Sequence, residues 1–303
     1  MVQPTRGISH ELNGRLYLPP KDLGQGYEHS DEQWFTHGYK NRANQFPFHL
    51  LVNSFLQINV NEMDYFCTME NYQVDVLCIA AHPDDVEISA GGTVAKLIAQ
   101  GYSVAIVDFT QGELGSRGSG PIRLKEAVEA SRILNVKYRE NLGLKDGFFQ
   151  YNEDSLKLII EVVRKYKPTI VLTNALHDRH PDHARAAKMV SDACFYSGLN
   201  KIEGMQHWRP KAVYHFNQDH YNKPDFVVDV TEFWDLKMAS LMAYRSQFYD
   251  PQSKEPETPI SGEGFFDYLR ARAIDFGRPA GYQLAEGFQV ARVPGVHDIM
   301  GLQ

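Results

Sequence analysis

Two short segments rich in histidine and aspartate carry the residues best suited to chemistry. The first, at 82–85, reads His-Pro-Asp-Asp, and the second, at 180–183, reads His-Pro-Asp-His. Imidazole nitrogens and carboxylate oxygens are common ligands of divalent metal ions. Together the segments offer His82, Asp85 and His183 as a two-histidine, one-carboxylate site that leaves positions open for water and substrate. The sequence therefore indicates a catalytic metal site.

Other interpretations of these residues stay open at this level. Asp84 and Asp85 could cap the following helix, with His82 bonded to a neighbouring backbone group. His82 and Asp84, with a distant histidine, also match the facial triad of iron(II) oxygenases, although those ligands usually lie on a β jelly roll. A non-catalytic sugar- or nucleotide-binding module is the third alternative. Such a module needs neither the additional carboxylate nor the second histidine–aspartate pair.

Each segment follows an apolar run that is typical of a buried strand. Residues 76–80 precede the first segment and residues 170–173 precede the second. Apolar residues resume at helical spacing after each segment, and further strands are expected at 104–107, 213–216 and 226–230. The alternation predicts an α/β fold with a Rossmann-like, mostly parallel sheet and helices on both faces. Ligands bind at the carboxyl ends of the strands in such a sheet, so the site is expected there.

With these motifs in hand, the chain resembles the LmbE-like, or PIG-L, family of zinc-dependent N-acetylglucosamine deacetylases. Within that family it looks most similar to the bacillithiol-biosynthesis deacetylases that act on N-acetylglucosaminyl malate. The resemblance runs from about residue 69 to residue 287. It rests on the motifs at 81–87, at 112–114 with Arg117 and Arg123, at 141–142 and at 178–183.

The resemblance implies an amide hydrolase that removes the acetyl group from an N-acetylglucosaminide. The first substrate it suggests is N-acetyl-α-D-glucosaminyl L-malate, and another N-acetylglucosamine conjugate is the alternative. It also implies one Zn²⁺ per subunit, held by His82, Asp85 and His183. Another divalent metal such as Fe²⁺ remains an alternative.

The same resemblance implies roles for the polar residues beside the ligands. Asp84 is expected to act as the general base. His180 is expected to stay charged and to stabilise the oxyanion or protonate the leaving amine, with Asp182 orienting its ring.

Three further residues are expected to bind the substrate. Arg123 begins a helix beside a glycine-rich loop, and its planar guanidinium suits a carboxylate; a surface ion pair with Glu126 or Glu129 is the alternative. Arg179 lies in the second segment and suits an acidic conjugate such as malate. Asp146 either binds a sugar hydroxyl or forms an Asx turn.

Composition limits the partners and the compartment. The 303 residues carry a net charge of -7 and are 43% hydrophobic, which supports a normal core and argues against nucleic-acid binding. The sequence contains neither a run of 18 apolar residues nor a signal pattern, and its three cysteines lack metal-binding spacing. We therefore expect a cytoplasmic protein without a nucleic-acid or membrane partner, and the resemblance implies a small-molecule glycoside substrate. The resemblance adds a homo-oligomer, since related enzymes are often hexamers.

The N-terminal part of the chain differs from the rest. Prolines, glycines and polar residues interrupt every candidate period in residues 1–68, and the resemblance begins only near Met69. We expect residues 1–68 to be an extension that is poorly ordered or not native, with a genuine N-terminal arm as the alternative. Residues 69–303 are expected to form the LmbE-like deacetylase domain, with a helix capped by Thr231 and no assigned role for residues 244–288.

Overall fold

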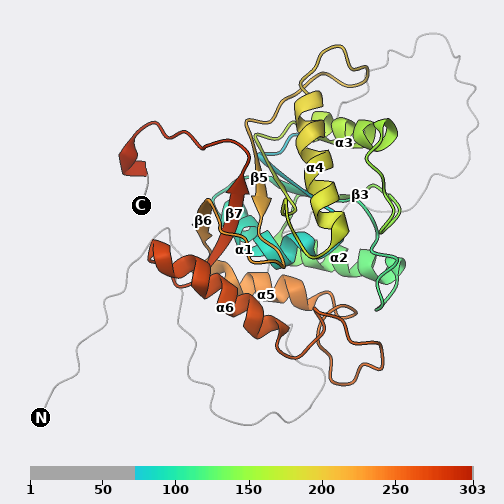
Figure 1. Cartoon of the computed structure of the whole chain (residues 1–303), viewed down its shortest axis with the longest axis vertical. Coiled ribbons are helices and arrows are strands. Elements are labelled where there is room, and N and C mark those ends of the chain that lie inside the picture. Colours follow the sequence, from blue (N-terminus) through green and yellow to red (C-terminus); the bar gives the residue numbers. More distant parts are fainter. Residues whose placement is uncertain (1–71, 302–303) are drawn as a thin grey trace, which may run out of the picture. The chain divides into compact units, whose positions relative to one another are not determined.

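The computed structural model describes residues 72–301, so the prediction for residues 1–68 lies outside the described part. The described strands form one sheet in the order β3-β2-β1-β4-β5-β7-β6 (Figure 1). Their bounds are β1 Val76–Ala80, β2 Val104–Asp108, β3 Tyr138–Asn141, β4 Ile170–Thr173, β5 Ala212–Phe216, β6 Phe226–Asp229 and β7 Ala285–Val290. The first five strands run parallel, and β7 is antiparallel to both β5 and β6. The predicted α/β class with a mostly parallel sheet is confirmed.

Helices cover both faces of this sheet (Figure 1). Their bounds are α1 Asp85–Ala99, α2 Gly120–Leu134, α3 Glu153–Tyr166, α4 Pro181–Tyr196, α5 Trp234–Met242 and α6 Phe265–Gly277. Three 3₁₀ turns are also described, η1 Thr231–Phe233, η2 Arg278–Ala280 and η3 Ile299–Gly301.

The alternation of side chains along β1 explains the two layers. Leu77 and Ile79 pack into a core with residues of α3 and α4. Val76, Cys78 and Ala80 point to the other face, where α1 packs on them. All five residues of β1 are buried, as expected for a central parallel strand covered on both sides. A third core joins α1 and α2 to α5 and α6.

The sheet places the site at the point where its strand order reverses. β1 pairs in parallel with β2 on one side and with β4 on the other. The connections after β1 and β4 therefore leave in opposite directions and open a crevice at the carboxyl ends of these strands. The segment at 82–85 follows β1 and the segment at 180–183 follows β4, as predicted.

One predicted helix start is wrong. Thr231 was expected to cap a helix, but it begins the 3₁₀ turn η1, and α5 starts only at Trp234. The hydroxyl of Thr231 donates to Oδ1 of Asp229 at 2.6 Å, so it serves the end of β6 instead of a helix N-terminus. The helix α6 and the first four residues of the antiparallel strand β7 lie within residues 244–288, to which the sequence assigned no role.

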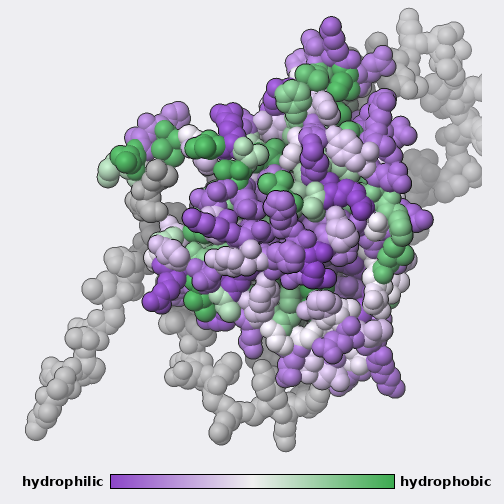
Figure 2. All heavy atoms as spheres, in the orientation of Figure 1, coloured by the Kyte–Doolittle hydropathy of each residue, from purple (hydrophilic) through white to green (hydrophobic). Residues whose placement is uncertain are grey.

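The surface shown in Figure 2 is largely hydrophilic, with hydrophobic residues scattered over it. The C-terminal segment after β7 exposes apolar side chains, among them Val293 and Ile299. Within residues 72–301, no helix is both long and apolar enough to cross a membrane.

Candidate metal centre and active-site cavity

The turn after β1 holds an aspartate in an unusual backbone conformation. Asp84 precedes α1 with φ 101° and ψ -25°, in a region that residues other than glycine rarely adopt. Among the described residues, its side chain makes no capping hydrogen bond to α1. The helix-capping interpretation is therefore wrong for Asp84. Backbone strain of this kind concentrates at functional sites.

Asp85 brings two histidines together. Its Oδ2 lies 3.5 Å from Nδ1 of His82, and its Oδ1 lies 3.3 Å from Nε2 of His183. All three side chains are buried. Ligand atoms of a tetrahedral zinc site with bonds of about 2.0–2.2 Å lie roughly 3.3–3.6 Å apart. Each imidazole therefore lies at a ligand-like distance from one oxygen of Asp85, His82 from Oδ2 and His183 from Oδ1.

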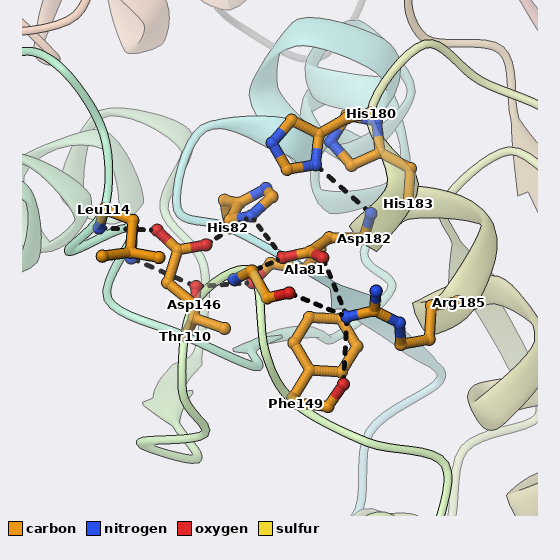
Figure 3. A network of polar contacts seen from close by, with 12 residues as sticks. Ala81, His82, Thr110, Leu114, Asp146, Phe149, His180, Asp182, His183 and Arg185 are labelled. Atoms are coloured by element: carbon orange, nitrogen blue, oxygen red, sulfur yellow. Dashed lines mark hydrogen bonds and ion pairs between the residues drawn. The ribbon is translucent and has the colours of Figure 1, made fainter.

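Other carboxylates hold each histidine from its far side. Nε2 of His82 lies 3.0 Å from Oδ1 of Asp146 and 3.3 Å from Oδ2 of Asp182 (Figure 3). Nδ1 of His183 lies 2.9 Å from Oδ2 of Asp178. Although burial raises the pKa values of these aspartates, their hydrogen bonds to histidine lower them overall, to about 2 for Asp146. The ionised carboxylates accept the imidazole protons. The other nitrogen of each ring then faces the shared carboxylate of the centre.

This set of donors fits a divalent metal ion. Carboxylates that accept the outer proton of a histidine fix its tautomer and orient its inner nitrogen toward a metal. Although burial lowers the pKa of His183, the charge of Asp85 raises it to about 9. The centre therefore stabilises positive charge, as a metal site must. Ligand atoms of His82, His180 and His183 also lie within 4.8 Å of one another, so His180 stands beside the centre.

Asp84 lies next to the predicted ligands, with its carboxylate held by Arg123. Nη2 of Arg123 donates to Oδ2 of Asp84 at 2.8 Å and to the carbonyl of Pro83 at 2.5 Å. Burial raises the pKa of Asp84 to about 7; Arg123 opposes this shift and Asp85 adds to it. A carboxyl group with a pKa near 7 is suited to accept a proton at neutral pH. This environment suits the predicted general base.

The position of Arg123 differs from the expected free fork for a substrate carboxylate. Its guanidinium is buried against Asp84, and the alternative partners Glu126 and Glu129 bind Ser246 and Arg132 instead. Arg123 still lines the cavity, and among the described residues its Nε has no hydrogen-bond partner. In the site, Arg123 holds the carboxylate of Asp84.

The side chain of Asp182 does not pair with the ring of His180, as the sequence had predicted that it would. Oδ2 of Asp182 accepts from the backbone N–H of Gly147 at 2.8 Å and faces His82, so this carboxylate does not orient the His180 ring. Instead, the backbone N–H of Asp182 donates to Nδ1 of His180 at 3.3 Å. Burial lowers the pKa of His180, and the charges of His82 and His183 lower it further. A lowered pKa favours the neutral form of the His180 imidazole over the charged form that was expected.

The predicted residues meet in one cavity of about 490 Å³. Those that line it are His82, Asp84, Asp85, Arg123, Asp146, Arg179, His180 and His183. Arg179 is partly exposed and paired with Asp219. Asp146 accepts from the backbone N–H of Leu114 at 2.9 Å besides holding His82, so it tethers a distant loop instead of forming an Asx turn.

Three residues that support the centre were missed by the sequence. Nδ2 of Asn174 donates to Oδ2 of Asp85 at 3.0 Å, and Nε2 of Gln218 donates to Oδ1 at 2.5 Å. Asn174 follows β4 and Gln218 follows β5, so their positions at the carboxyl ends of predicted strands could have identified them as site residues. Asp178 opens the second motif, and the preference of metal-bound histidines for a carboxylate partner could have identified it.

The chain is similar to several known deacetylases. A family model described as PIG-L, GlcNAc-PI de-N-acetylase, matches residues 77–194. The diacetylchitobiose deacetylase of Thermococcus kodakarensis is 31% identical over 235 residues, which cover 73% of this chain and 84% of that protein. A probable N-acetyl-α-D-glucosaminyl L-malate deacetylase 2 of Bacillus subtilis is 26% identical over 57% of this chain and 82% of its own length.

A solved structure gives the same result. The crystal structure of the conserved protein TT1542 from Thermus thermophilus superposes with a TM-score of 0.67 at 34% identity, covering 75% of this chain and 98% of that one. The match in sequence extends over most of the diacetylchitobiose deacetylase, and the fold is shared with TT1542. The chain belongs to the PIG-L, or LmbE-like, family of metal-dependent N-deacetylases.

Proposed function

We propose that this protein is a zinc-dependent hydrolase that removes the acetyl group from an N-acetylglucosaminide. The observation that carries the proposal is the carboxylate of Asp85 between the inner nitrogens of His82 and His183, with Asp84 beside them at the same cavity. The deacetylases among its relatives support the reaction and the sugar.

A Zn²⁺ ion held by His82, Asp85 and His183 would supply a Lewis acid able to polarise the acetyl carbonyl and to acidify a water molecule. Asp84 takes the proton of the attacking water, while Arg123 holds its carboxylate in place. His180 accepts a backbone N–H at Nδ1, so its neutral ring carries the proton at Nε2. That N–H donates to the developing oxyanion, and the proton that Asp84 took from the water passes to the leaving amine.

The substrate is defined further by the group attached to its N-acetylglucosamine unit. The Bacillus relative supports the malate conjugate, which the resemblance to bacillithiol-biosynthesis deacetylases also implies. The charges of the cavity favour a neutral conjugate, because its two described arginines, Arg123 and Arg179, are each paired with a carboxylate. A dianion such as malate would have to compete for those guanidinium groups. Diacetylchitobiose, the substrate named for the Thermococcus relative, is therefore the stronger candidate.

The test is release of acetate by the zinc-loaded protein from three compounds, namely N,N′-diacetylchitobiose, N-acetylglucosaminyl malate and N-acetylglucosamine. We expect acetate from at least one of them, the highest kcat/KM on diacetylchitobiose, and loss of activity after chelation that added zinc restores. A preference for the malate conjugate would reverse the choice of conjugate. Failure to release acetate from any N-acetylglucosaminide would contradict the proposed function.

A further inference from the structure

One side of the active-site cavity ends in exposed apolar surface. Phe148 is 63% exposed and Leu114 is 57% exposed, and both line the cavity. The side chain of Leu114 packs close to Gly147, since a Cβ on that glycine would lie 3.2 Å from Cδ1 of Leu114. Leu114 and Phe148 thus form an apolar platform beside the opening. Exposed aromatic side chains at the edge of a site commonly serve recognition.

The platform is fastened to the metal centre. Asp146, which holds His82, accepts the backbone N–H of Leu114 at 2.9 Å. Asp182, which also holds His82, accepts the backbone N–H of Gly147 at 2.8 Å. The two carboxylates that orient one predicted ligand therefore also position both loops of the platform.

Further contacts hold the loop of Phe148 from outside. Nη1 of Arg185 donates to the carbonyls of Gly147 and Phe149 at 3.2 and 3.0 Å. The backbone N–H of Phe148 donates to the carbonyl of Lys145 at 3.1 Å. The backbone of the turn that carries Phe148 is thus held in place relative to the centre, which reduces the entropy lost on binding. Nζ of Lys145 lies 5.2 Å from the centroid of the Phe148 ring, which leaves the opposite face of the ring for a ligand.

We propose that this platform binds the group attached to the N-acetylglucosamine unit and that this group is a second pyranose ring. The inference rests on the proposed function and names the substrate class of that site. A pyranose has an apolar C–H face that packs on an aromatic ring, whereas a small dicarboxylate has none. The platform is continuous with the cavity that holds the catalytic residues, so one disaccharide can occupy both.

Comparing a disaccharide with a monosaccharide tests the platform. In the zinc-loaded full chain, Phe148→Ala should reduce kcat/KM for N,N′-diacetylchitobiose by about tenfold, mainly through KM, which is the scale of one aromatic packing interaction. N-acetylglucosamine should change by less than about twofold, because it lacks the second ring. Phe148→Trp should restore the preference for the disaccharide.

Phe195→Ala is the matched control. Phe195 lies on α4, is 55% exposed and packs on Arg209 and Tyr196, so removing it tests the loss of an exposed phenylalanine at a different place. It should leave both substrates unchanged. Equal losses on both sugars in Phe148→Ala, or a loss in Phe195→Ala as large as in Phe148→Ala, would overturn the inference.

A binding measurement separates this inference from the proposed function. N,N′-diacetylchitobiose is titrated calorimetrically into the zinc-loaded Asp84→Asn protein, with and without Phe148→Ala. Binding weakened about tenfold by Phe148→Ala supports the platform even if the wild type releases no acetate, in which case only the proposed function fails. Equal binding by the two proteins contradicts the platform, whatever the activity.

Discussion

Asp84 and Asp85 are neighbours in the chain but have different partners. Asp85 faces His82 and His183 and accepts side-chain amides from Asn174 and Gln218. Asp84 lies in a left-handed turn and its carboxylate is held by an arginine. The left-handed backbone of Asp84 separates the two carboxylates, so one can serve the metal and the other the proton.

Asp84→Asn tests this separation. The amide cannot accept the proton of the attacking water, so kcat should fall about 100-fold or more, the usual scale for loss of a general base. Zinc content, measured by elemental analysis, should stay near that of the wild type. Asp85→Asn is the matched control and should lose zinc and activity together. If Asp84→Asn lost the metal and Asp85→Asn kept it, the two assignments would have to be exchanged.

Asp178 offers a second test at the level of single residues. Its Oδ2 accepts from Nδ1 of His183, so Asp178→Asn should release that ring and weaken zinc binding about 10- to 100-fold. The measurement is competition with a chelator of known affinity. Asp192→Asn, on the same helix as His183 and paired with Lys188, is the control and should bind zinc normally. Unchanged affinity in Asp178→Asn would remove Asp178 from the support of the centre.

At the scale of elements, a buried ion pair fastens α1 to the antiparallel part of the sheet. Glu286 of β7 accepts the backbone N–H groups of Gly92 and Thr93 at 3.0 and 2.7 Å. Lys237 of α5 donates to Glu286 at 2.5 Å and to the carbonyl of Ile88 at 2.8 Å. The helix that begins with a predicted metal ligand is thereby tied to α5 and β7.

Lys237→Met should therefore be costly. It leaves the buried carboxylate of Glu286 without its cation, and breaking a buried pair in this way costs about 3–5 kcal/mol. Urea unfolding measures the loss. Lys188→Met removes an exposed lysine of an ion pair on α4 and should cost less than about 1 kcal/mol. A similar small effect for both variants would show that the pair does not fasten α1.

In the molecule as a whole, the sequence could predict those parts of the site that consist of residues close together in the chain. β1 and β4 are short apolar runs that occur at the predicted positions 76–80 and 170–173, and each is followed by its histidine motif. In a parallel sheet the carboxyl ends of the strands lie on the same side, so polar residues that follow two such strands are expected to meet there. The fold class and the meeting of the two motifs follow from this local information.

The remaining features depend on contacts between distant segments. His82 meets Asp146 and Asp182, which are 64 and 100 residues away, and no periodicity specifies which histidine a given aspartate will face. The same holds for Arg123, whose partner Asp84 lies 39 residues earlier. β7 was missed because Glu286 and Gly287 interrupt its apolar residues, so its sequence lacks the apolar run of β1 or β4.

Zinc binding should stabilise the whole domain, because its predicted ligands join the loops after β1 and β4. At free zinc about 100 times the Kd, linkage adds about 2.7 kcal/mol, which corresponds to a rise in Tm of roughly 5–10 °C for a domain of this size. Differential scanning calorimetry with and without zinc measures the rise. His183→Ala should show little of it. An equal rise in that variant would mean that the metal binds the fold elsewhere.

The position of the bound metal decides whether Asp85 and the two histidines hold it. Crystals of the zinc-loaded protein, measured at the zinc absorption edge, should show one anomalous peak per chain within about 2.0–2.2 Å of Nδ1 of His82, Asp85 and Nε2 of His183. The far side of His82 is a real competitor, because ligand atoms of His82, Asp146 and Asp182 also lie within 4.8 Å of one another. A peak bound by Asp146 and Asp182, with none at Asp85 and His183, would contradict the account.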